Sequence, residues 1–229
     1  MKHKLTIVFS LLLLFATMSF SQVVNLTNPG AGPYATIQLA IDNAATVNGD
    51  IISVSAGSYP HGVNVTKSLT FRGANFGVAG NAVRGAESII DGTDAVMDMG
   101  FIIALPSLTV TIDGFTFTDC SPAHDDYSPG VDGTTDWTTN VTFTNNIVSS
   151  ANALQCGNVL TYWGTVTVTN NWFTHIDTEV NSSAVVLALC QNSIVSSNVF
   201  DNINYSAISL SDNQTATVNG NNINITSVQ

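Results

Sequence analysis

Basic side chains are scarce in this sequence. Its 229 residues include only five Lys and Arg, against sixteen Asp and Glu, and the formal net charge is −11. Binding to nucleic acid or to anionic lipid head groups depends on Lys and Arg side chains that neutralise phosphate. The composition therefore excludes nucleic acid as a partner.

Long apolar runs are missing too, apart from one at the start of the chain. Lys2 and Lys4 precede a mainly apolar stretch, residues 5–18, which is followed by the small residues Ser19 and Ser21. This order is typical of a secretory signal peptide, and the stretch is shorter than the about 20 residues that a membrane-spanning helix needs. We predict cleavage after Ser21, no membrane insertion of the mature chain, and a secreted or cell-surface location.

Cysteines are few, and they lack the close spacing of a metal-binding pair. An odd number, here Cys120, Cys156 and Cys190, cannot all pair within one chain. Because free cysteine is among the most buried residue types, we interpret them as small core or turn residues. One disulfide between Cys156 and Cys190 stays open as an alternative, since an exported chain meets an oxidising compartment.

What the chain does contain is a repeat of short alternating segments. Six of them share one pattern, at residues 69–73, 110–114, 141–145, 166–170, 193–197 and 216–220, and the separation between them falls from 41 residues to between 23 and 27. A period near 25, with β-branched and aromatic residues in place of helical patterning, is typical of a solenoid with about three strands per coil. The sequence therefore predicts an all-β fold, a right-handed single-stranded parallel β-helix.

Alternation within the repeat assigns each column of residues to the inside or the outside of the solenoid. The third residue of each segment points inward in this interpretation, which gives the file Phe71, Ile112, Phe143, Val168, Val195 and Val218. The residue before it points outward, which gives a ladder of Thr70, Thr111, Thr142, Thr167, Ile194 and Thr217. Asparagines follow most segments, and we expect them to hydrogen-bond from coil to coil.

The chain divides into three parts: a signal peptide over residues 1–21, an N-terminal cap over 22–50, and the coils over 51–229. The cap includes a predicted capping α-helix, with Thr36 as its N-cap and with Ile37, Ala40, Ile41 and Ala44 on one face. Because the repeat pattern is still running near Gln229, we expect the natural protein to be longer.

Four stretches, residues 34–42, 49–59, 68–74 and 88–92, together resemble the N-terminal region of pectin-lyase-like β-helix proteins. That group includes pectin methylesterases, pectate-lyase-like proteins and many bacterial surface proteins. The resemblance implies the fold and leaves the activity open, since this architecture hosts lyases, esterases, hydrolases and non-catalytic adhesins. The chain lacks the Arg-Ile-Lys element of polygalacturonases and the Gln-rich motif of the methylesterases, and it has few basic residues for lyase chemistry.

An insertion between residues 118 and 140 holds most of the candidate site residues, and loops on a rigid scaffold are where function concentrates. The weak catalytic candidates are His124, Asp125 and Asp126, as general acid and base. A Ca²⁺ ion, the one candidate cofactor, is a hard cation that prefers oxygen ligands, here Asp125, Asp126, Asp132 and Asp136. Candidate aromatic contacts to carbohydrate are Tyr127, Trp137, Tyr162 and Trp163. A solvated polar loop without a ligand is the competing interpretation.

These features leave three functional hypotheses. The leading one is a non-catalytic scaffold for adhesion or glycan binding, with a polysaccharide or surface glycan as partner. The alternative is a polysaccharide-active enzyme, a lyase, esterase or hydrolase. A third is that the threonine ladder binds an ordered surface such as ice or a crystalline polymer, although threonine is also a common outward strand residue.

The signal peptide generates the first testable prediction. When the full chain is expressed in a secreting host, the exported protein should begin at Gln22, because Ser19 and Ser21 are the small residues that precede the cleaved bond. N-terminal sequencing or intact mass of the exported protein measures this. Recovery of the protein only inside the cell with Met1 intact would contradict it.

Overall fold

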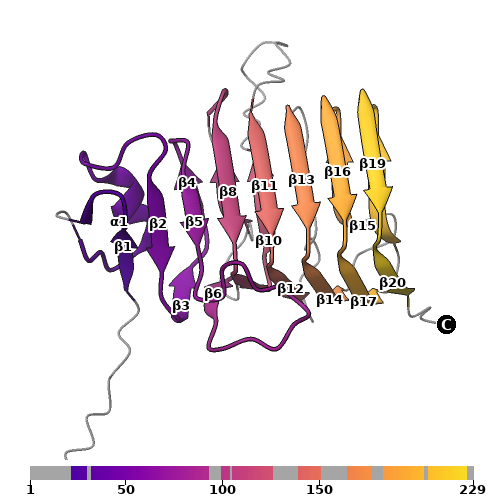
Figure 1. Cartoon of the computed structure of the whole chain (residues 1–229), viewed down its shortest axis with the longest axis horizontal. Helices are drawn as coiled ribbons and strands as arrows, with labels where there is room; N and C mark the ends of the chain where they lie inside the picture. Colours follow the sequence, from indigo (N-terminus) through magenta and orange to yellow (C-terminus); the bar gives the residue numbers. More distant parts are fainter. Residues whose placement is uncertain are drawn as a thin grey trace, which may run out of the picture.

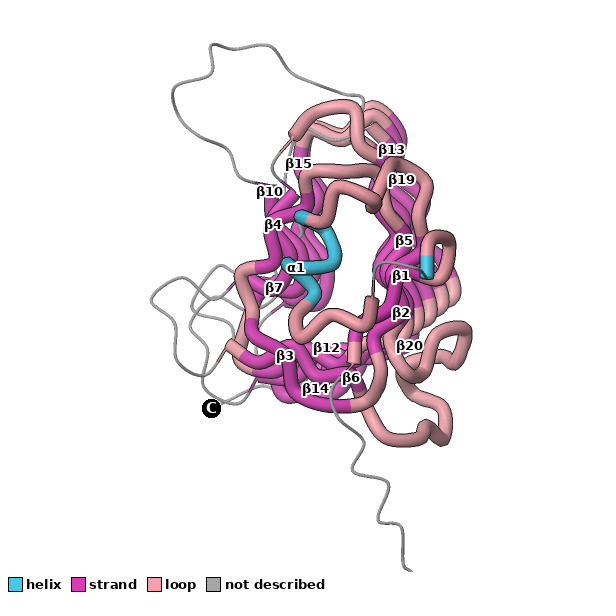
Figure 2. The backbone as a smooth tube through the Cα atoms, turned by 90° about the vertical axis from the view of Figure 1, so that its left-hand side faces the viewer, coloured by secondary structure: helices cyan, strands magenta, loops and turns pink. Residues whose placement is uncertain are grey.

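The chain winds into a parallel β-solenoid, which confirms the prediction from the repeat. The computed structural model describes residues 22–29, 32–92, 99–103, 105–125, 139–150, 164–176, 183–203 and 206–225. Seen from one end, the coils form three walls (Figure 2), and the buried apolar side chains form one core cluster. Within the described residues, no helix is long and apolar enough to cross a membrane.

The first wall is an eight-stranded sheet in which residues from successive coils lie side by side (Figure 1). Its order is β1 (Val23–Asn25), β2 (Ile51–Val54), β5 (Thr70–Arg72), β8 (Thr109–Asp113), β11 (Asn140–Thr144), β13 (Thr165–Thr169), β16 (Asn192–Ser196) and β19 (Thr215–Asn219). Every neighbouring pair from β2 onward is parallel, whereas β1 pairs with β2 in antiparallel fashion. Parallel pairing of segments about 25 residues apart is what a solenoid with one strand per coil in each wall requires.

The second wall contains seven strands and follows the first wall within each coil. Its members are β3 (Gly57–Pro60), β6 (Ser88–Asp91), β9 (Thr116–Thr118), β12 (Ile147–Ser150), β14 (Trp172–Ile176), β17 (Val199–Ile203) and β20 (Asn222–Ile225). The third wall is described in two parts: β4 (Val63–Val65), β7 (Met99–Ile103) and β10 (Ser121–Asp125), and the pair β15 (Ser183–Ala188) and β18 (Ser206–Ser211). Its predicted strand near residue 159 lies outside the described residues.

The interior is built from files of like side chains stacked along the solenoid. The strand register places Phe71, Ile112, Phe143, Val168, Val195 and Val218 in one file, as predicted. All but Val218 are fully buried, and burial of an aliphatic or aromatic side chain contributes about 1.5–3 kcal/mol. A second file supplies rings from the second wall, where Phe173 and Phe200 stack with centroids 4.9 Å apart. Cys120 and Cys190 are buried as well, whereas Cys156 lies outside the described residues.

An asparagine ladder fills the corner between the first and second walls. Its members are Asn146, Asn171, Asn198 and Asn221. The Oδ1 of Asn171 accepts from the Asn146 N–H at 2.8 Å, and the Oδ1 of Asn198 accepts from the Asn171 N–H at 3.0 Å. Each Nδ2 in turn donates to a backbone carbonyl of the preceding coil, as Asn171 does to the Phe143 carbonyl at 2.9 Å. These bonds satisfy buried backbone groups that water cannot reach, and they confirm the predicted coil-to-coil bonding.

The residue before each ladder asparagine turns the chain into the second wall. Asn145, Asn170 and Ser197 have φ values of 56°, 56° and 57°, in the left-handed region, and Gly114 and Gly220 have 82° and 61°. Glycine and asparagine adopt this conformation more readily than bulkier residues. The polar turn residues of the repeat are therefore a backbone requirement of the corner.

The N-terminal end differs in two respects from the expectation. Helix α1 (Ile37–Asp42) forms with Thr36 as N-cap, whose Oγ1 accepts from the Leu39 N–H at 3.2 Å, but it ends before Ala44. Ala44 is exposed, so its assignment to the buried helical face was wrong, because Asn43 already adopts an extended conformation. The antiparallel strand β1, which no periodicity in the sequence indicated, covers the edge of β2. That α1 caps the solenoid stays a prediction.

The hydrogen bonds of the asparagine ladder predict that removing one side-chain amide causes a large loss of stability. Asn171→Ala leaves the buried Asn146 N–H and Phe143 carbonyl without their partner, so the free energy of unfolding should fall by about 2–4 kcal/mol. Urea denaturation of the mature protein measures this. The matched control is Asn192→Ala, whose outward side chain accepts a bond from Thr215 near solvent, and we expect a change within about 0.5 kcal/mol. Equal effects of the two variants would contradict a structural role of the ladder.

Candidate functional site

The described part of the structure includes only two of the residues that the sequence singles out as site candidates. His124 and Asp125 lie on strand β10, with their backbones opposite Ile102 and Ile103 of β7, and their side chains are outside what is described. The other candidates lie outside the described residues: Asp126, Tyr127, Asp132, Asp136, Trp137, Tyr162 and Trp163. The catalytic, calcium and aromatic assignments therefore stay predictions. Among the described residues, no three His, Cys, Asp or Glu side chains gather into a metal-binding group.

The outer surface of the first wall carries three files of mainly polar side chains, which we call the threonine face. Its middle file is Ile51, Thr70, Thr111, Thr142, Thr167, Ile194 and Thr217. One flanking file is Thr109, Asn140, Thr165, Asn192 and Thr215, and the other is Ser53, Arg72, Asp113, Thr144, Thr169, Ser196 and Asn219. The predicted ladder is thus confirmed as the centre of a wider array.

Bonds within the array hold its side chains in place. The Oγ1 atoms of Thr144 and Thr169 lie 3.1 Å apart, and the Thr215 hydroxyl donates to Asn192 Oδ1 at 2.8 Å. The β-branched side chain of threonine also restricts χ1 more than most side chains do. The flanking files of the threonine face therefore include hydroxyl and amide groups that are already bonded to one another.

Charge on the threonine face is confined to one place. Its charged members are Arg72 and Asp113, which face each other across β5 and β8. Asp113 Oδ1 accepts bonds from the Gly77 N–H and from Asn145 Nδ2, both at 2.9 Å, and the Arg72 guanidinium lies 4.8 Å from the ring centroid of Phe76. Both charged groups are thus engaged beside the corner, and the rest of the face is neutral.

A second feature, the loop of residues 73–87, crosses three corners of the solenoid, and we call it the strap. It leaves β5 and returns at β6, passing beneath the corner region of the following coils (Figure 1). The Gly80 N–H donates to the Asn170 carbonyl at 2.8 Å, so the strap reaches the corner between β13 and β14. A Cβ at Gly80 would overlap the Asn146 carbonyl oxygen and the Trp172 nitrogen, so only glycine fits this approach.

Arg84 is the main anchor of the strap. Its side chain is only 4% exposed, and its guanidinium forms a two-point ion pair with Glu87 at 2.8 and 2.9 Å. The same group donates to the Asn145 carbonyl at 2.6 Å, and Glu87 accepts from the Thr116 hydroxyl at 2.9 Å. One of the few basic residues in the chain is therefore used in the structure of the strap.

The spacing of the repeat carries a signal for the strap. The separation of 41 residues between Phe71 and Ile112 is the largest in the series, longer than the one that contains the 118–140 insertion. Spacing alone cannot say whether extra residues project into solvent or lie along the coils. Here Gly73 and Gly80 allow the backbone of the strap to approach the corners.

Comparison with known proteins adds no relative. A scan of protein-family models and searches of the curated proteins and of the solved structures found no match to this chain. The description of the fold therefore depends on the structure itself.

The anchoring of the strap predicts a local effect of Arg84→Ala. Removing one partner of a buried ion pair costs about 3 kcal/mol, so thermolysin should cut within residues 76–83 at least about tenfold faster than in the wild type. Val83→Ala serves as the control, because the Val83 side chain is 99% exposed and its loss leaves the anchor intact. Time courses of cleavage at one protease concentration measure the difference. Equal rates for wild type and Arg84→Ala would show that other contacts hold the strap.

Proposed function

We propose that this protein is a secreted or cell-surface β-helix of the pectin-lyase-like kind that binds neutral polysaccharide without cleaving it. The observation that supports this most directly is the threonine face, with its three registered files made mainly of Thr, Ser and Asn. Hydroxyl and amide groups both donate and accept hydrogen bonds, which is the chemistry that sugar hydroxyls present. A neutral polymer is favoured over uronates because the chain carries a net charge of −11.

The energetics favour a long ligand over a small one. A hydrogen bond that replaces bonds to water contributes only about 0.5–1.5 kcal/mol, so a few contacts to one sugar give weak binding. The strands of the first wall repeat every about 4.8 Å, and an extended polymer laid along the solenoid meets each of them in turn. Because threonine has restricted χ1 freedom and some of these side chains are already bonded to each other, little side-chain entropy is lost at each contact.

The experiment is binding of the mature protein to insoluble neutral polysaccharides, measured by depletion from solution. In the triple variant Thr111→Val, Thr142→Val and Thr167→Val, valine keeps the shape and the strand preference of each residue but removes its hydroxyl. We expect the bound fraction to fall at least about threefold, in line with the loss of several bonds of modest strength. The control is Thr118→Val on the second wall, which should bind like the wild type.

Three results would overturn the proposal. Release of new reducing ends or unsaturated products from pectin, alginate or neutral glycans, with Ca²⁺ present, would make the protein an enzyme, with the 118–140 insertion as the place to search. Thermal hysteresis without polysaccharide binding, abolished by the triple valine variant, would assign the threonine face to ice. Undiminished polysaccharide binding by that variant would move the binding site elsewhere.

A further inference from the structure

The outer surface of the second wall carries an apolar file that the core does not use. The register places Trp172 between Ile147 of β12 and Val199 of β17, and all three side chains are half-buried. The inward positions of the same strands belong to other residues, Val148, Phe173 and Phe200, which are fully buried. Trp172, Ile147 and Val199 therefore face outward, where neighbouring positions of the fold are mostly polar.

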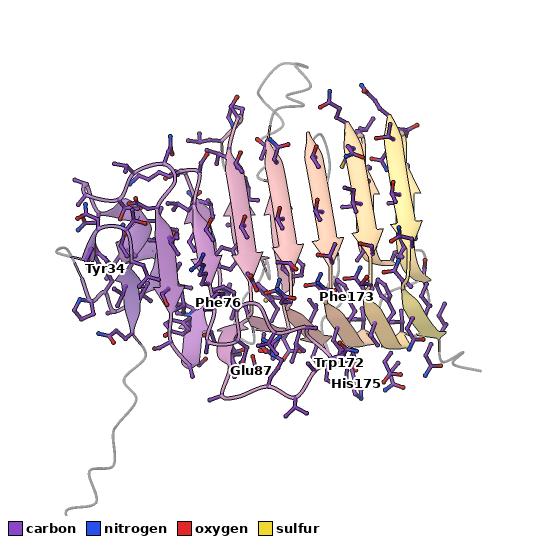
Figure 3. All side chains as sticks on the ribbon, in the orientation of Figure 1. Tyr34, Phe76, Glu87, Trp172, Phe173 and His175 are labelled. Carbon is purple, nitrogen blue, oxygen red and sulfur yellow. The ribbon has the colours of Figure 1, made fainter. Side chains whose placement is uncertain are left out.

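The strap contacts part of this file and reaches along it as far as Trp172. Glu87 bonds to Thr116, the member of the file that precedes Ile147, and Gly80 lies against the backbone of Trp172. Beyond Trp172, no strap contact is described on Val199. Figure 3 shows Glu87 and Trp172 along this lower edge of the molecule, with His175 beside them. Trp172 is thus the last member of the file that the strap is described as contacting.

Polar groups border the file on the side away from the strap. Asp201 follows on β17 and is half-buried, and its Oδ1 accepts from Asn224 Nδ2 at 2.9 Å. His175 is exposed, and its φ of 53° marks a bulge at which the register skips from Thr174 to Ile176. Bulges re-aim side chains at the ends of strands. The surroundings of Trp172 therefore combine an apolar surface with a carboxylate and an imidazole at its rim.

We propose that Trp172, with Ile147 and Val199, forms a platform on which the apolar face of a neutral pyranose ring stacks. The indole is a large apolar body, and aromatic side chains dominate the energetics of such contacts. Asp201 and His175 are positioned at the rim to bond with ring hydroxyls, as in sites where a few polar groups orient a ligand on an apolar surface. This platform rests on the proposed glycan binding, but it uses a different wall from the threonine face.

The test is a titration of intrinsic tryptophan fluorescence with soluble neutral oligosaccharides, such as cello-, chito- and manno-oligosaccharides. We expect the wild-type emission to change and saturate, and Trp172→Ala to lose at least about tenfold in affinity, whereas Trp172→Phe keeps most of it when binding is followed by calorimetry. Phe76→Ala is the matched control, because Phe76 is a 51% exposed aromatic on the strap that stands over Arg72 and not in the platform. Urea midpoints should be equal across the set.

The two proposals fail separately. If Trp172→Ala binds oligosaccharides as the wild type does, the platform is wrong, and polysaccharide binding lost in the triple valine variant would still support the threonine face. If Trp172→Ala loses affinity only together with stability, Trp172 has a structural role and the platform is also wrong. If the wild type binds neither oligosaccharide nor polysaccharide, both proposals fall.

Discussion

The register between successive coils depends on hydrogen bonds made by buried amides. Each ladder asparagine both accepts from and donates to the backbone of the preceding coil, so a slip of two residues would leave several buried groups unsatisfied. Apolar stacking alone would tolerate a slip of two residues more easily, because inward positions two residues apart are both apolar, as Val110 and Ile112 are on β8. The ladder is thus the constraint that fixes which side chains share a file, inside and outside.

Fixed files explain how a chain with so little charge can present a defined surface. Only 9% of its residues are charged, so much of its polar surface consists of hydroxyl and amide groups. Two of the charged residues, Arg84 and Glu87, form the ion pair that anchors the strap. The threonine face is regular because its outward residues are separated by the distance between neighbouring strands of the sheet. Backbone geometry therefore sets the geometry of the proposed binding surface.

The sequence was informative where one coil repeats another. The interior file, the threonine ladder and the asparagine corner were all predictable, because stacking like residues leaves a period that can be read directly. Strand β1 and the strap occur once each and leave no period, so the sequence could not place them. The outward apolar file of Ile147, Trp172 and Val199 was missed for a related reason: only the register shows which side chains lie side by side.

The strap also changes how the molecule would respond to force. A simple solenoid passes tension only from each coil to the next, and it can unravel one winding at a time from a pulled end. Here Arg84 and Gly80 join the β5–β6 segment to the corners after β11 and β13, so the windings between them share one mechanical unit. A load applied at the β19 end would peel away the unstrapped windings first and would then meet a block that yields as a whole.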